Sequence, residues 1–97
     1  MTDIVITHAL RTPIGKMGGT LAPLSAVDMG VHAAKAVLEQ SGIDPALVDE
    51  VYFGHARQAG NGPNSARQVA LRAGLRETTI ATTVNMACAS GLKSIVL

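Results

Sequence analysis

Cys88 is the residue of this chain whose chemistry stands out, because it is the only cysteine and lies where an apolar strand is predicted to turn into a helix. The surrounding run, residues 85–93, reads NMACASGLK. The first N–H groups of a helix are unpaired and carry partial positive charge, so a thiolate placed there is stabilised and becomes a nucleophile at neutral pH. The alternative is a small buried hydrophobic residue, as most lone free cysteines are.

Small residues surround Cys88 and favour the nucleophile. They let the backbone approach a substrate closely, and they are Ala87, Ala89, Ser90 and Gly91. The backbone N–H of Cys88 could donate a hydrogen bond to a thioester oxygen as negative charge develops there. A thiolate that attacks a thioester also needs a base to remove its proton, and no residue of this sequence is an obvious candidate.

The elements that must position this run are predicted to alternate between strand and helix. Apolar runs rich in β-branched residues predict strands over residues 4–6, 51–53 and 78–84, the first of them buried. Helical spacing of apolar residues predicts one helix over 25–42 and another over 64–74. This alternation is typical of an α/β fold with a parallel sheet and right-handed crossovers.

Local signals mark the ends of the first helix and a turn after it. Ser25 and Asp28 have the spacing of a capping box, with Asp in place of the usual Glu or Gln. Gly42 suits a helix stop, because glycine readily adopts the left-handed conformation found there. Asp44 followed by Pro45 predicts a short helical turn.

The segment over residues 55–64 is predicted to be a loop, because it contains two glycines and a proline. Either Asn64 or Ser65 caps the helix that follows. Arg57 and Arg67 lie beside the glycine-rich part of this loop and could contact an anionic ligand. Arginines in such places more often pair with carboxylates or with another subunit, so a structural role is expected.

The end of the chain is apolar. From Cys88 onward a helix is predicted whose only charged residue is Lys93, and its large apolar residues are Leu92, Ile95, Val96 and Leu97. A helix that is apolar nearly all round is normally buried inside a larger protein, and a domain of this size rarely buries one completely. We therefore expect the chain to be the front part of a longer protein.

Composition narrows the class of protein. The chain has 97 residues, enough for one small domain; 47% are hydrophobic and only 2% aromatic, which suits tightly packed helices and parallel strands. The net charge of +1 comes without a basic stripe, so no nucleic-acid partner is expected. A single cysteine, no signal-like segment and no long apolar stretch predict a soluble, cytoplasmic protein with no membrane partner.

Other candidate sites favour structural interpretations. The loop over 11–19 places Lys16 among glycines but matches no phosphate-binding motif, and no helix begins directly after it. His8, His32 and His55 have no metal-ligand spacing with Cys88, so no metal site is expected. His55 follows the second strand, an edge where α/β sheets often carry sites, but a catalytic role is not favoured.

Three motifs together resemble the thiolases, the acetyl-CoA acetyltransferases. Residues 85–93 look like the nucleophile motif of that family, and residues 11–16, RTPIGK, resemble the loop after its first strand. Residues 54–60, GHARQAG, with 64–68, NSARQ, resemble the loop and helix before the nucleophile strand. The matches occur in family order across the whole chain, and the cysteine motif is the most specific of them.

The resemblance implies a thiolase-like fold, in which two similar βαβαβ halves stack into α-β-α-β-α layers. Residues 1–97 would be the N-terminal part of the thiolase N-terminal domain, ending in or near the nucleophile helix. They would form the front part of the first half, α/β with a parallel-rich mixed sheet, incomplete on its own. Cys88 would start a helix buried between the sheets.

The resemblance also implies a two-step reaction. Cys88 is acylated by an acyl-CoA, and the acyl group then passes to coenzyme A in thiolysis, or to an acetyl-CoA carbanion in Claisen condensation. Acyl-CoA and coenzyme A are then substrates, and no separate cofactor is expected. The histidine base and second cysteine of the family lie in C-terminal motifs that this sequence lacks, so activity is expected only of the full-length protein.

Family members are commonly homodimers or homotetramers, which makes residues 60–67 and 78–84 expected interface segments. Two alternatives stay open at this point. One is a ketosynthase of the same wider superfamily, acting on acyl carrier protein. The other is a fragment with no catalytic function.

Overall fold

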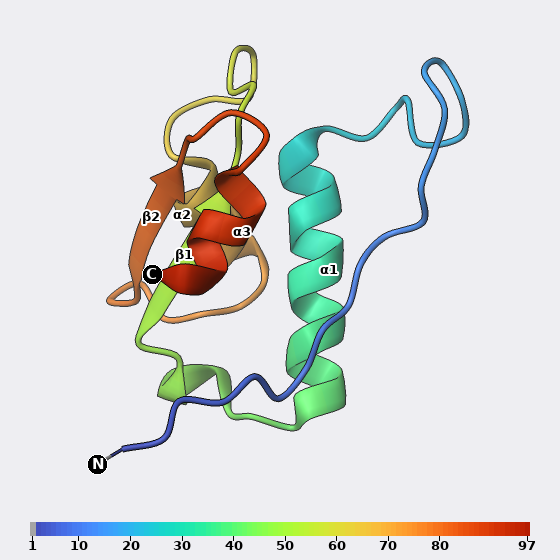
Figure 1. Ribbon diagram of the computed structural model, residues 1–97. Helices are drawn as coiled ribbons and strands as arrows, with labels where there is room; N and C mark the ends of the chain where they lie inside the picture. The colour runs from blue at the N-terminus through green and yellow to red at the C-terminus, as the bar shows by residue number, and fades with distance from the viewer. Residues whose placement is uncertain (1) are drawn as a thin grey trace.

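The computed structural model describes residues 2–97, in which helices pack against a pair of parallel strands (Figure 1). The elements, in chain order, are α1 (Ala26–Ser41), the 3-10 helix η1 (Pro45–Leu47), β1 (Glu50–Gly54), α2 (Ser65–Arg72), β2 (Ile80–Val84) and α3 (Ser90–Val96). From α1 onward this order confirms the predicted alternation of helix and strand.

The two strands pair in parallel, and α2 forms the connection between them. The register runs from Glu50 opposite Ile80 to Gly54 opposite Val84, so both strands end at the same edge of the sheet. The chain therefore leaves β1 and β2 side by side. The loop after the first strand and the Cys88 run after the second are neighbours for that reason.

The capping box at the start of α1 is confirmed. The Ser25 hydroxyl accepts from the backbone N–H of Asp28 at 3.0 Å, and the Asp28 carboxylate accepts from the N–H of Ser25 at 2.9 Å. Gly42 ends the helix in the left-handed conformation, at φ 67°. Asp28 also pairs with Arg72 at 2.9 Å, which ties α1 to α2. The Ser25 N–H and then the Arg72 guanidinium hold the pKa of Asp28 below its ordinary value.

Of the two candidate caps for α2, the structure selects Asn64. Its side chain accepts from the N–H of Arg67 at 3.3 Å, and its backbone adopts φ 39°. Asparagine tolerates this left-handed conformation better than most residues do. The helix itself ends at Arg72, shortly before Gly74, which has φ 95°. The short turn predicted at Asp44 and Pro45 is η1, with the Asp44 side chain accepting from the N–H of Ala46 at 2.9 Å.

The core is small and lies between α1, α2 and β1. Val27 and Val31 of α1 are buried against Val69 of α2, and Ala34 and Phe53 pack against this cluster. Gly30 of α1 allows the close packing, because a Cβ there would stand 2.7 Å from the ring of Phe53 and 3.0 Å from the side chain of Val69.

The prediction of a buried strand over residues 4–6 is wrong. Ile4, Val5 and Ile6 are 95%, 72% and 77% exposed, and the extended segment that contains them runs beside α1 (Figure 1). A strand gains its stability from hydrogen bonds to a neighbouring strand and from packing on its faces. Within residues 2–97, β1 and β2 pair with each other and no strand lies alongside this segment.

The last helix is left largely exposed within residues 2–97, as expected of an apolar helix that a domain of this size cannot bury. α3 packs on β1, yet Leu92, Ile95 and Val96 are about two-thirds exposed, at 70%, 67% and 69%. The reason is that no element among residues 2–97 covers the outer face of α3. Its inner face is close to β1, whereas its apolar outer face meets solvent.

Candidate functional site

Cys88 lies in the turn between β2 and α3, with its thiol free and exposed. The helix begins at Ser90, so the prediction that Cys88 starts it is wrong by two residues. The reason is local: the N–H of Ala89 donates to the carbonyl of Met86 at 3.1 Å, and the N–H of Ser90 donates to the carbonyl of Ala87 at 3.2 Å. These bonds close tight turns before helical hydrogen bonding starts.

The turn holds Ala87 in an unusual backbone conformation. Its φ is 49°, in the left-handed region that residues other than glycine seldom occupy. The Asn85 carboxamide oxygen accepts from the N–H of Ala87 at 3.0 Å. The Ser90 hydroxyl donates to the carbonyl of Ala87 at 2.6 Å and accepts from the N–H of Met86 at 2.9 Å. Both polar groups of Ala87 are therefore held, directly before Cys88.

Two contacts tie this turn to the end of β1. The Asn85 amide nitrogen donates to the carbonyl of Ala56 at 3.1 Å. Gly54 lies so close to α3 that a Cβ there would stand 2.5 Å from the carbonyl carbon and oxygen of Ser90. Only glycine allows that approach. In the sequence, a glycine directly after an apolar strand was the one available sign of this close approach.

The structure places His55 in a framework role. It is 9% exposed, and its Nδ1 lies 2.6 Å from the hydroxyl of the buried Ser65. Its backbone N–H donates to the carbonyl of Val84 at 2.9 Å, and its carbonyl accepts from the Gln58 side chain at 2.8 Å. Among residues 2–97, no hydrogen bond joins a histidine ring to Cys88. These partners support a structural role for His55, which stays a prediction.

A polar network joins the cap of α2 to β2 and was not predicted from the sequence. The Thr83 hydroxyl donates to the Asn64 carboxamide oxygen at 2.7 Å and accepts from the N–H of Ala66 at 3.0 Å. The Asn64 amide nitrogen donates to the carbonyl of Ala81 at 3.2 Å. These bonds fasten the start of α2 to the strand that leads to Cys88. Threonine on a strand gives no sign of such a role in the sequence.

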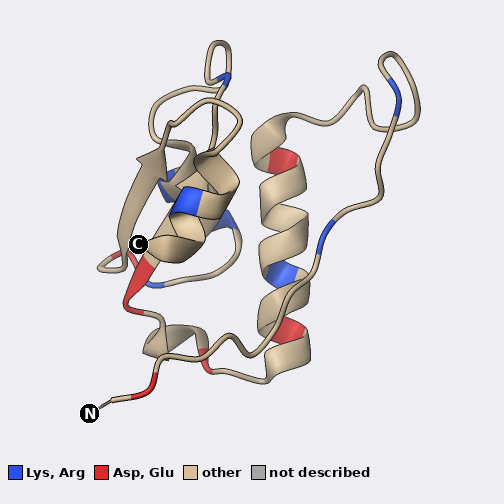
Figure 2. Cartoon of the chain, viewed as in Figure 1, with Lys and Arg blue, Asp and Glu red and all other residues tan. Residues whose placement is uncertain are grey.

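The remaining candidate cations and histidines are not brought to Cys88 by the contacts observed. Arg67 donates to the backbone carbonyl of Glu77 at 2.8 Å, rather than to a carboxylate, and Arg57 is exposed. His32 is exposed on α1. Figure 2 shows acidic and basic residues on helices, on loops and at the start of β1, whereas β2 carries none; Lys93 is the one basic residue of α3. In the part of the chain described, no group of three His, Cys, Asp or Glu side chains could hold a metal ion.

The loop over residues 11–19 has no helix directly after it, as predicted. Lys16 is exposed and its carbonyl accepts from the N–H of Gly19 at 2.9 Å, which forms a turn, and α1 begins only at Ala26.

None of the described helices is long and apolar enough to cross a membrane.

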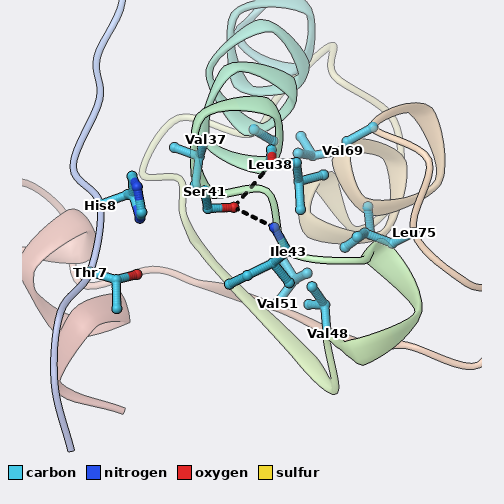
Figure 3. Close-up of a pocket in the computed structure, with 13 residues that line it drawn as sticks. Thr7, His8, Val37, Leu38, Ser41, Ile43, Val48, Val51, Val69 and Leu75 are labelled. Atoms are coloured by element: carbon cyan, nitrogen blue, oxygen red, sulfur yellow. Dashed lines mark hydrogen bonds between the residues drawn. The ribbon is translucent and has the colours of Figure 1, made fainter.

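An apolar cavity of about 250 Å³ lies away from the Cys88 turn, between α1, α2, β1 and the extended N-terminal segment (Figure 3). Figure 3 shows Thr7 and His8 on one side of it and Val37, Leu38, Val51, Val69 and Leu75 on the others. Its Ser41 hydroxyl donates to the carbonyl of Leu38 and accepts from the N–H of Ile43. Its lining is mostly aliphatic, its Ser41 hydroxyl is paired and Cys88 does not line it, so this cavity is not part of the candidate site.

Comparison with known proteins places this geometry in a family. The model of the thiolase N-terminal domain matches residues 4–97. The chain is 50% identical over 97 residues to an acetyl-CoA acetyltransferase of Escherichia coli and 47% identical to one of Cupriavidus necator; in both cases all of the chain matches 25% of the relative. It spans about a quarter of the length of these relatives.

A solved thiolase structure has the same fold over most of this chain. The crystal structure of Acat5 thiolase from Ascaris suum in complex with coenzyme A superposes with a TM-score of 0.87 at 33% identity, over 90% of this chain and 23% of that one. The fold is therefore thiolase-like and incomplete, as the sequence motifs implied. Sequence and structure together show that this chain belongs to the thiolase family, through the N-terminal domain that residues 4–97 match.

Proposed function

We propose that the protein containing this chain is an acyltransferase acting on acyl-CoA thioesters, and that Cys88 receives the acyl group. The observation that carries the proposal is the position of Cys88: the sole cysteine of a thiolase-family chain, exposed in a turn held by Asn85 and Ser90. The relatives named acetyl-CoA acetyltransferases support the reaction class, and the Ascaris thiolase complex supports coenzyme A as a ligand. These relatives favour coenzyme A thioesters over substrates carried by acyl carrier protein.

The proposed reaction has two steps. The Cys88 thiolate attacks the carbonyl carbon of an acyl-CoA, the bond from that carbon to the coenzyme A sulfur breaks, and coenzyme A leaves and takes up a proton. The acyl group is then bound to Cys88 as a thioester. In condensation to acetoacetyl-CoA, the carbanion of acetyl-CoA then attacks the acyl carbon and the Cys88 thiolate leaves. Thiolysis runs in the opposite direction: the Cys88 thiolate attacks the 3-keto carbon of a 3-ketoacyl-CoA, the bond between C2 and C3 breaks, and acetyl-CoA leaves as a carbanion that takes up a proton. A coenzyme A thiolate then attacks the acyl group on Cys88, and the Cys88 thiolate leaves. No separate cofactor enters either step.

We assign the backbone N–H of Cys88 to the oxyanion that forms when the thiolate attacks. Donors aimed at developing negative charge are among the strongest contributors to acyl transfer. We assign the base that removes the thiol proton to residues outside this sequence, because the ring of His55 is buried and its Nδ1 is hydrogen-bonded to Ser65. We accordingly propose that residues 1–97 are the N-terminal part of the thiolase N-terminal domain and are inactive alone.

We further propose that the full-length protein is a cytoplasmic homodimer or homotetramer. Residues 60–67 and 78–84 are the proposed contact segments, and Ile80 of β2, at 59% exposure, is an apolar side chain available there. Light scattering after size-exclusion chromatography of the full-length protein measures the assembly, and Ile80→Glu is expected to weaken it. A monomer at micromolar concentration would contradict this part of the proposal.

The test of the acyl acceptor is direct. Full-length protein is incubated with acetyl-CoA, digested and analysed by peptide mass spectrometry, with Cys88→Ser as the matched control. The acetyl group is expected on Cys88, and its presence on another residue instead would overturn the assignment. The 97-residue chain alone is expected to give no detectable thiolysis of acetoacetyl-CoA; robust turnover would disprove the assignment of the base to residues outside it.

A further inference from the structure

We infer that Asn85 is a positioning residue for Cys88: its side chain holds Ala87 in the left-handed conformation and ties the nucleophile turn to the end of β1. The inference rests on the proposed function of Cys88. Asn85 does not have to touch the substrate to act in this way. It sets the backbone from which the thiol projects.

Both ends of the Asn85 carboxamide are used. The oxygen accepts from the N–H of Ala87 at 3.0 Å, inside the turn. The nitrogen donates to the carbonyl of Ala56 at 3.1 Å, 29 residues away along the chain. A residue needed only to end β2 would not require a donor and an acceptor aimed in two directions. One side chain thus links the turn that carries Cys88 to the loop after β1.

The backbone of Ala87 explains why this matters. At φ 49° the Cβ of Ala87 crowds the backbone, so without the hydrogen bonds that restrain it this alanine would adopt a negative φ. Ser90 holds the carbonyl of Ala87, whereas Asn85 holds its N–H. If Asn85 is removed, Ser90 still holds the peptide between Ala87 and Cys88 by its carbonyl, but the peptide between Met86 and Ala87 loses the partner of its N–H. The φ angle of Ala87 can then relax from 49°, and Cys88, the next residue, shifts with it.

The experiment measures acetylation of Cys88 by acetyl-CoA in the full-length protein, by peptide mass spectrometry against time, together with kcat and KM for thiolysis. Asn85→Ala is expected to lower kcat and the acetylation rate about 100-fold, because small misplacements of a reacting group cost that much. KM for the acyl-CoA should stay within about twofold, since a residue that acts only through the backbone before Cys88 changes the reacting group and not the binding of the acyl-CoA. Asn85→Ser, whose hydroxyl can accept from the N–H two residues on, should lose less.

A second substitution separates positioning from folding. Ala87→Gly removes the conformational penalty of the left-handed backbone, so in the Asn85→Ala background it should restore about fivefold of the lost rate. A purely structural Asn85 would predict no such rescue, because glycine adds flexibility and no packing. Ser41→Ala is the matched control: its hydroxyl also donates to one backbone carbonyl, that of Leu38, and accepts from one backbone N–H, that of Ile43, but it lies at the end of α1, so its loss should leave the rate unchanged.

The outcomes are distinguishable. If the unaltered protein is not acetylated on Cys88, the proposed function fails, and the positioning role with it. If the unaltered protein is acetylated and Asn85→Ala is acetylated equally fast, only the positioning role fails. A slowed Asn85→Ala variant that Ala87→Gly does not rescue also overturns the inference, because the loss would then not act through the backbone of Ala87.

Discussion

The two connections that leave the parallel strands start side by side and differ in almost every other respect. After β1 the chain takes ten residues, 55–64, to reach the cap of α2, and its first residue, His55, is buried against Ser65. After β2 it takes only five residues, 85–89, to reach α3, and that turn exposes Cys88.

The difference teaches how one sheet edge can carry both a framework and the candidate nucleophile. In the longer connection, the Asn64 side chain accepts a hydrogen bond from Thr83 of β2, and this bond fastens α2 to the sheet. In the shorter connection, the side chains of Asn85 and Ser90 hydrogen-bond a single strained residue, Ala87. Substitutions in the first should therefore change stability, whereas substitutions in the second should change acyl transfer.

The largest effect is expected for Cys88→Ala in the short connection. Loss of the acyl acceptor should reduce thiolysis by the full-length protein by about 10⁴-fold or more. The free energy of unfolding should change by less than about 0.5 kcal/mol, because the side chain is exposed. Steady-state kinetics and urea denaturation measure the two quantities, and near-normal turnover would contradict the contrast between the connections.

Gly54→Ala tests the point where the two connections meet. The new methyl group would stand 2.5 Å from the backbone of Ser90, so α3 must move away from β1. We expect a loss of about 3 kcal/mol in the free energy of unfolding, and a fall in kcat of about 100-fold as the Cys88 turn shifts. Gly42→Ala is a useful comparison, since its Cβ would meet nothing within 4 Å and only its φ of 67° would be strained. Unchanged kcat in Gly54→Ala would show that the approach to α3 does not place Cys88.

His55→Ala probes the long connection and should affect stability alone. It leaves the buried Ser65 hydroxyl without its ring partner, which should cost about 2 kcal/mol in the free energy of unfolding. After correction for the folded fraction, kcat should stay within about threefold of the unaltered enzyme. His55→Gln, which can still bond Ser65, is the milder control. A fall in kcat comparable with that of Cys88→Ala would assign His55 to catalysis.

Asn64→Ala is expected to have a smaller effect on the same connection. It removes the cap of α2 and the acceptor for the Thr83 hydroxyl, which should cost about 1 kcal/mol. Asn64→Gly should lose less, because glycine tolerates φ 39° and is an acceptable cap. Thermal unfolding of the three proteins ranks them, and an equal loss for Ala and Gly would remove backbone conformation as a cause.

The smallest effect on the free energy of unfolding is expected from a substitution of Asp28, which lies outside both connections. Its pKa is held below 3.8 in the folded protein, chiefly by the Ser25 N–H and then by Arg72. A lowered folded pKa means that the charged carboxylate stabilises the fold above the ordinary pKa, and that this contribution is lost as pH falls through the folded value. Asp28→Asn should therefore be less stable near neutral pH, with the difference shrinking below pH 3.8. Urea denaturation at a series of pH values tests this, and a gap that widens in acid would reverse the sign.

The sequence anticipated most of the local structure because caps and strand ends depend on neighbouring residues. The capping box of Ser25 and Asp28, the glycine stop and the short turn at Pro45 were all predicted, and each bond involved spans only a few residues. The strand over 4–6 failed for the opposite reason. Its composition suits a strand, but a strand also needs an edge to pair with, and composition does not supply one.

Within the candidate site, the cysteine motif could be identified from the sequence, whereas the hydrogen bonds that hold the turn around Cys88 could not be predicted from it. Residues 85–93 identified Cys88 and the thiolase family, because residue types at fixed spacing are visible in the chain. The helix start at Ser90 and the left-handed Ala87 were missed, because they depend on side-chain hydrogen bonds from Asn85 and Ser90 that no spacing rule predicts.

The sequence by itself determined the family, the identity of the candidate nucleophile and the local ends of its helices. Only the tertiary structure decided that Gly54 touches Ser90, that Asn85 reaches Ala56 and that His55 is committed to Ser65. The physical reason is the parallel pairing of β1 with β2. That pairing brings the ends of the two strands together, and with them residues about 30 positions apart whose contacts then hold Cys88 in place.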